Sequence, residues 1–247
     1  MKLLTVGNPK LVKGQKQGYL SFVLHLAPST LSGYNVCPMA SAGCAAACLN
    51  TAGRGGIMKK GESTNNIQRA RIRRTVMFFE QRDAFMATLV NDIKLGIKQA
   101  EKLNLVPVFR LNGTSDIRWE TVEVTIGGIT YNNVMGLFPT VQFYDYTKLN
   151  NRRNLPANYH LTFSRSESND ADVNMVINGI EGIRTSSDIN IAVVFDKLPA
   201  TFLGRPVING DETDLRFLDP RRVIVGLKAK GKAKKDNSGF TILSKGN

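Results

Sequence analysis

Six short apolar runs are spread along this chain, most of them separated by helical or turn segments. Those runs that are continuously apolar rather than alternating indicate burial on both faces of a sheet. They cover residues 19–26, 106–111, 141–146, 159–164, 189–195 and 223–227. Strands separated by such crossovers favour a parallel sheet with right-handed connections. We therefore expect an α/β fold, either an open, partial barrel or a parallel sheet of about six strands with flanking helices.

The longest helical pattern covers residues 65–103 and breaks near 81–83, where it divides into two helices. Its second half places apolar side chains on one face, namely Phe85, Leu89, Ile93 and Ile97. Weaker patterns predict a helix over 119–124, a turn or hairpin over 126–135 and a helix over 173–184. No internal repeat or linker divides the chain. We expect one α/β domain over 1–247 with a basic C-terminal tail at 228–247.

All three cysteines fall within twelve residues, in the segment CPMASAGCAAACLN. Cys37, Cys44 and Cys48 have the spacing C-x6-C-x3-C, and thiolates so close in sequence can hold zinc or an iron–sulfur cluster. Structural zinc normally takes four ligands, and the nearest candidates, His25 and His160, lie on predicted strands. A [4Fe–4S] cluster needs only three thiolates and leaves one iron open. Small, alanine-rich segments also bury cysteine simply as a small hydrophobe. The pattern favours iron–sulfur and leaves zinc or no metal as alternatives.

The charge balance points to a polyanionic partner. Thirty-three Lys and Arg against 20 Asp and Glu give a net charge of +13, which favours nucleic acid because neutralised phosphates release counterions. On a helix, Arg69, Arg73 and Arg74 share roughly one face, while Arg71 points elsewhere. The other candidate nucleic-acid-binding residues are Lys228, Lys230, Lys232, Lys234 and Lys235. The alternative is a solvated basic surface with no nucleic-acid role, and nothing here distinguishes DNA from RNA.

Other site classes leave weaker traces. A carboxylate cluster for two-metal nuclease chemistry could be built from Asp116, Asp145, Glu167 and Asp211 or Asp214, although these residues can equally cap helices and pair with arginines. No apolar stretch approaches the roughly 20 residues of a membrane span. The N-terminal apolar run is too short for a signal-peptide core. We therefore expect a cytoplasmic protein with no membrane partner.

The cysteine loop directly follows the first predicted strand of a roughly six-stranded partial barrel, and in this the chain resembles the radical S-adenosylmethionine (SAM) enzymes. Those enzymes usually space their cysteines C-x3-C-x2-C, which differs from the spacing here. More narrowly, the chain resembles a family of bacteriophage proteins called gene product 88. The shared features are the Cys/Gly/Ala loop, the segment FRLNGTSD and the run GDETDLRFLDPRRVIVGLKAKG.

The radical SAM resemblance implies that the three cysteines ligate three irons of a [4Fe–4S] cluster while SAM chelates the fourth. Reductive cleavage would then give a deoxyadenosyl radical that removes a substrate hydrogen. The resemblance places Asn112 and Gly113 at the SAM amino group, and Ser164, Arg165 and Ser166 at its ribose or carboxylate. Together with the basic charge, it implies an enzyme that acts on nucleic acid or a nucleotide in the cytoplasm of an infected host cell. The alternatives are a non-catalytic nucleic-acid-binding protein with structural zinc or no metal, and a metal-dependent nuclease.

Overall fold

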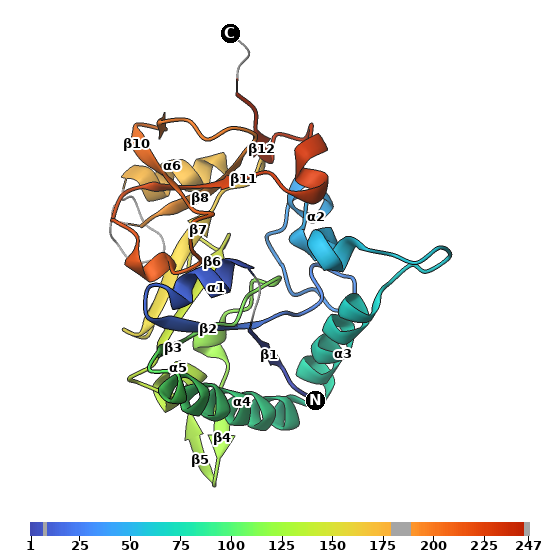
Figure 1. Ribbon diagram of the computed structural model, residues 1–247, viewed down its shortest axis with the longest axis vertical. Helices are drawn as coiled ribbons and strands as arrows, with labels where there is room; N and C mark the ends of the chain where they lie inside the picture. Colours follow the sequence, from blue (N-terminus) through green and yellow to red (C-terminus); the bar gives the residue numbers. More distant parts are fainter. Residues whose placement is uncertain (7–8, 179–188, 245–247) are drawn as a thin grey trace.

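The computed structural model describes residues 1–6, 9–178 and 189–244, and its centre is one large, mostly parallel sheet (Figure 1). Within the described residues the strand order is β1-β2-β3-β6-β7-β8-β11-β10-β9, and β12 pairs with β8. The parallel strands are β2 (Tyr19–Leu24), β3 (Val106–Arg110), β6 (Gln142–Thr147), β7 (Tyr159–Ser164), β8 (Ile191–Phe195), β10 (Arg205–Asn209), β11 (Ile224–Lys228) and β12 (Thr241–Ile242). Two short strands pair antiparallel at the edges, β1 (Leu4–Thr5) with β2 and β9 (Thr201–Phe202) with β10. Because β1 and β9 lie at opposite ends of the strand order and do not pair with each other, the sheet is open.

The expectation of a mostly parallel α/β sheet is confirmed. All six apolar runs form strands of this sheet, each with ends within two residues of the predicted range. In the sheet they follow one another in chain order, as consecutive strands commonly do. Strands β7 and β8 pair only as far as Ser164 and Ala192, and β12 pairs with the C-terminal half of β8 instead. The predicted basic tail is thus folded into the sheet as far as Ile242.

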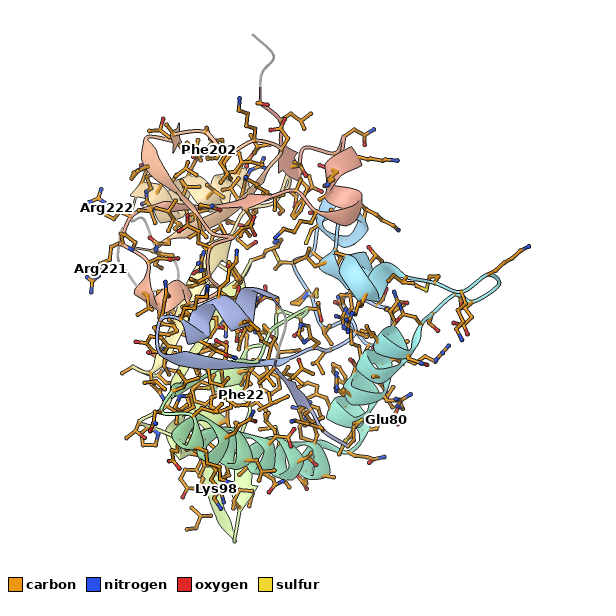
Figure 2. The ribbon with its side chains drawn as sticks, viewed as in Figure 1. Phe22, Glu80, Lys98, Phe202, Arg221 and Arg222 are labelled. Carbon is orange, nitrogen blue, oxygen red and sulfur yellow. The ribbon has the colours of Figure 1, made fainter. Side chains whose placement is uncertain are left out.

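Helices α3 (Asn66–Glu80) and α4 (Arg82–Lys102) confirm the predicted pair and its break at Gln81. Along α4, Phe85, Leu89 and Ile93 are fully buried against the sheet, as the apolar pattern predicts. Gly96 permits a close approach, because a Cβ there would lie 3.1 Å from the ring of Phe22 on β2. Phe22 lies between β2 and α4, whereas the exposed Lys98 points away from the sheet (Figure 2).

The opposite face of the sheet is covered by α1 (Pro9–Gln15) and by the 3-10 turn η4 (Arg216–Leu218). Here Tyr144 and Val108 pack with Leu215, and the rings of Tyr144 and Phe217 have centroids 5.5 Å apart. Because side chains alternate along a strand, this face is separate from the one that α4 covers. Helix α1 and η4 come from distant parts of the chain, and neither is predicted from the sequence.

The remaining elements are short. They are α2 (Ala42–Ala46), α5 (Val134–Leu137), α6 (Asp170–Asn178), the 3-10 turns η1 (Leu49–Thr51), η2 (Gly53–Gly56), η3 (Trp119–Thr121) and η5 (Gly231–Lys235), and the hairpin β4 (Val124–Ile126) and β5 (Ile129–Tyr131). The hairpin confirms the prediction for 126–135. The predicted helix over 119–124 is wrong beyond one turn, because its β-branched residues favour an extended strand. Residues 179–184 of the helix predicted over 173–184 lie outside the described residues. No helix in the described part of the chain is long and apolar enough to span a bilayer.

Candidate functional site

A pocket of about 410 Å³ lies at the C-terminal ends of the parallel strands. Each of six strands, or the residue that follows it, contributes to its lining, through His25, Arg110, Tyr146, Ser164, Val194 and Leu227. In a parallel sheet these ends meet at one edge, where ligands characteristically bind. The fold thus forms a pocket where the sequence places its polar turns.

All three cysteines line this pocket. Cys37 lies in the loop after β2, Cys44 lies in α2, and Cys48 caps the N-terminus of η1. Each is a partly exposed free thiol. The Cys37 thiol donates to the carbonyl of Thr114 at 3.7 Å and accepts from the Ser29 amide at 3.4 Å. The fold therefore brings the three thiols to one wall of a pocket, as their clustering predicts.

Two of the three thiols, those of Cys37 and Cys48, have raised pKa values because they are partly buried. Burial raises the pKa of Cys37 to about 12. Burial also raises the pKa of Cys48, although a hydrogen bond from the Asn50 amide and the charges of Arg71 and Lys148 oppose the rise. A bound metal centre displaces such protons, because the thiolate is the ligand. Among the described residues, no three His, Cys, Asp or Glu side chains lie close enough together to hold a single metal ion.

Glu167, just beyond β7, holds the cysteine helix α2 in place. Its carboxylate accepts from the Gly43 amide and from the Ser41 hydroxyl, both at 2.7 Å. The Ser41 oxygen in turn accepts from the Cys44 amide at 3.1 Å and caps the helix. Gly43 leaves room for this contact, since a Cβ there would lie 2.7 Å from a Glu167 oxygen. One carboxylate thus connects the end of β7 to the cysteine loop.

Replacing Glu167 with glutamine is expected to loosen α2. Each carboxylate oxygen now accepts one bond, from Gly43 or from Ser41, and the NH2 group that replaces one of these oxygens cannot accept. Losing one charge-assisted bond of this kind costs about 1–2 kcal/mol. We expect Cys44 to react about tenfold faster with a thiol reagent, as measured by the rate of disulfide exchange. Glu123→Gln, at an exposed position before β4, is the matched control. Unchanged labelling in both variants would show that Glu167 does not position the loop.

The FRLNGTSD segment lines the pocket with Asn112, Gly113 and the residues after them. The amide of Asn112 donates to Asp145 at 2.7 Å, and that of Gly113 donates to the carbonyl of Leu24 at 2.9 Å. The Asn112 side-chain oxygen accepts from the amide of Ile117 and from the Trp119 indole. The two backbone amides and the Asn112 side-chain oxygen are therefore used by the fold itself, and the same segment turns the Thr114 carbonyl towards Cys37.

Of the three residues after β7, only Ser164 lines the pocket, and its hydroxyl accepts from the Lys148 ammonium at 2.8 Å. The Arg165 guanidinium turns away to Asp170 and the carbonyl of Gly239. Ser166 is fully buried, and its amide donates to Asn169. Consecutive residues leaving a strand point in different directions, so a run of three does not reach one ligand.

The predicted basic residues divide between pocket and surface. Arg69 donates to the carbonyl of Thr64, Arg74 donates to that of Lys2, and Arg73 is exposed. Lys228 and Lys230 line the pocket. The other three lysines are exposed on η5, namely Lys232, Lys234 and Lys235.

Arg71, which the helical pattern separates from the other arginines, lines the pocket. Its position between the buried residues Gln68 and Thr75 on α3 is the signal in the sequence, because residues three and four apart share a helix face. On this otherwise charged helix, the uncharged side chains of Gln68 and Thr75 mark the face that is covered.

A sequence model of the Gene product 88 family matches residues 2–243. The chain belongs to this family of bacteriophage proteins. Comparison with curated proteins and with solved structures finds no match. The three segments that carry the resemblance lie far apart in the sequence, yet residues of all three line the pocket: the cysteine loop, FRLNGTSD and the run that begins at Gly210.

The carboxylates considered for two-metal nuclease chemistry are each bound to other groups in this Gene product 88 protein, and Asp116, Asp211 and Asp214 line the pocket. Asp116 accepts from the Lys148 amide at 2.8 Å, Asp214 pairs with Arg110 at 2.9 Å, and Asp211 pairs with Lys230 at 2.7 Å. Asp145 is fully buried beneath the pocket, and Glu167 holds α2. These carboxylates anchor loops and pair with cations, which is the alternative that the sequence leaves open beside nuclease chemistry.

Asp145 gives the Gene product 88 fold a titrating group in its interior. Burial raises its pKa to about 7, opposed chiefly by Arg110. A carboxyl whose folded pKa lies above its unfolded value stabilises the fold below about pH 4 and loses that contribution as pH rises to about 7. Against an Asp145→Asn variant, the wild type should lose on the order of 3 kcal/mol over this range in urea unfolding. A constant difference between the two proteins would show that Asp145 stays charged beside Arg110.

Proposed function

We propose that this Gene product 88 protein is a radical-SAM-like enzyme in which Cys37, Cys44 and Cys48 hold a [4Fe–4S] cluster. Its substrate is nucleic acid or a nucleotide. The observation that supports this most strongly is the position of the three cysteine thiols in the fold. The three thiols come from one region after the first parallel strand and line the pocket at the C-terminal ends of six of these strands. The open sheet, in which these six strands follow one another in chain order, agrees with a partial barrel of the radical SAM kind.

The donor set fits such a cluster better than it fits zinc. A tetrahedral zinc ion draws four ligands to about 2.3 Å, so its sulfurs nearly touch one another. The chain has only three cysteines, one fewer than a four-thiolate zinc site needs. A four-iron cluster is larger, holds its thiolates further apart and needs only three. Small side chains beside the thiols, Ala40 and Ala47, leave space in the pocket.

When bound, the cluster would supply the electron that cleaves SAM reductively. The chain's own residues exclude water and position groups around it. Glu167 anchors α2, and burial keeps water from Cys37 and Cys48. Lys148, held by Ser164, places a positive charge near the Cys48 thiol and favours its deprotonated form.

The second candidate function is non-catalytic binding of nucleic acid. It is favoured by the exposed lysines of η5, which lies beside the cysteine loop (Figure 1). Ala233 of η5 packs against Ala47 between two of the cysteines. A protein with this function alone would bind DNA or RNA in a strongly salt-dependent manner and would not cleave SAM.

The proposal is tested by incubating the anaerobically reconstituted protein with SAM and dithionite and measuring 5′-deoxyadenosine by chromatography. We expect the product with the wild type and none with Cys48→Ala. Ala45→Ser, at an exposed position of α2, is the control and should retain the activity. Salt-sensitive nucleic-acid binding without any 5′-deoxyadenosine would favour the second candidate instead.

A further inference from the structure

The pocket carries more positive than negative charge. Its cationic lining residues are Arg71, Arg110, Lys148, Lys228 and Lys230, and its carboxylates are Asp116, Asp211 and Asp214. Arg110 pairs with Asp214, and Lys230 pairs with Asp211. Asp116 lies 3.8 Å from Arg152, a fully buried residue behind the pocket. Three cations therefore remain without a carboxylate partner in the described part of the chain.

Arg71 is the most constrained of the three. One of its guanidinium nitrogens donates to the side-chain oxygen of Asn50, which is itself buried. Its Nε is also buried and finds no hydrogen-bond partner among the described residues. Burial lowers the pKa of Arg71, with Cys48 opposing and Arg74 reinforcing this effect. A guanidinium that is partly desolvated and lacks a counter-ion stabilises a bound anion.

Lys148 and Lys228 complete the group from the ends of two strands. The ammonium of Lys148 donates to Ser164 and lies 5.7 Å from the ring centroid of Phe240. The backbone amide of Lys228 is held by Asp211, which fixes where this side chain leaves β11. Both Arg71 and Lys148 act electrostatically on Cys48, so the anion they attract lies beside the cysteine wall.

We infer that this pocket binds a phosphate group of the substrate through Arg71, Lys148 and Lys228. As a statement of substrate class, the inference rests on the function proposed above, although phosphate binding itself requires no cluster. Three cations without carboxylate partners match a phosphate group, which carries up to two negative charges as a monoester and one as a diester. The phosphate can belong to a free nucleotide or to a nucleic-acid strand.

The test is calorimetric titration of inorganic phosphate into the full-length protein at constant ionic strength. We expect saturable binding to the wild type and about tenfold weaker binding to Arg71→Gln and to Lys148→Met, because each loses one charge-assisted bond. Arg73→Gln, exposed on the same helix as Arg71, should bind as the wild type does. Equal affinity in wild type, Arg71→Gln and Lys148→Met, or no binding to the wild type, would overturn the inference.

Competition experiments identify the source of the phosphate. Displacement by thymidine 5′-monophosphate indicates a nucleotide substrate, and displacement by an oligothymidylate without terminal phosphates indicates a strand. Acetate that displaced phosphate equally well would contradict the assignment to phosphate. The same titration with Cys44→Ala separates the two proposals. If neither protein assembles a cluster and Cys44→Ala binds phosphate as the wild type does, the phosphate site is supported and the cluster is refuted.

Discussion

Replacing Arg152 with methionine is expected to lower the free energy of unfolding by about 3–5 kcal/mol, the largest effect on stability that we predict. Arg152 is fully buried. Its guanidinium donates from Nε to Glu120 at 2.9 Å and from Nη2 to the second oxygen of the same carboxylate. It also donates to the Tyr159 hydroxyl and lies 3.8 Å from Asp116. Without it, two shielded carboxylates lose the cation that compensates for their burial.

Urea unfolding measures this loss, and companion variants identify its cause. Arg152→Lys keeps the charge but not the two-pronged contact, so we expect an intermediate loss. Arg152→Met combined with Glu120→Met removes both charges and should recover part of the stability. A loss below about 1 kcal/mol would show that the pair is not buried as described.

Replacing Cys44 with alanine is expected to abolish incorporation of the iron–sulfur cluster, the largest functional effect that we predict. Three thiolates are the minimum for the proposed [4Fe–4S] centre, and no fourth cysteine exists in the chain to substitute. Iron and acid-labile sulfide are measured after anaerobic reconstitution. Ala45→Ser on the same helix should load as the wild type does. Since Cys44 is partly exposed, its loss should change the stability of the apo protein by less than about 1 kcal/mol. Full loading of Cys44→Ala would remove this residue from the ligand set.

The sheet could be predicted from the sequence because its strands are buried on both faces. Runs such as 191–195 and 223–227 are continuously apolar and short, a pattern that few other elements share. The break between α3 and α4 was visible in the polar Gln81–Asp83 stretch of the helical pattern. The two-residue strands β1, β9 and β12 were not predictable, because partners distant in the sequence define them and no local periodicity does.

The three cysteines of the candidate site were predictable from the sequence, and the positions of several residues around them were not. Clustering in the chain was enough to bring the three cysteines together. Arg71 was missed because a charge run is typical of a solvated face, although its position between Gln68 and Thr75 on α3 was a signal that it turns inward. Arg165 and Ser166 follow a strand that reaches the pocket, yet contacts with Asp170 and Asn169 turn them away. The direction in which each of these side chains points depends on its partners in the folded protein, which the periodicity of the sequence does not encode.

The most direct test of the account is metal and sulfide analysis of the wild-type protein after anaerobic purification and iron reconstitution. We predict a brown protein with about four irons and four sulfides per chain, and visible absorption that bleaches on reduction with dithionite. A colourless protein that contains one tightly bound zinc, or no metal at all, would contradict the assignment of an iron–sulfur centre to Cys37, Cys44 and Cys48.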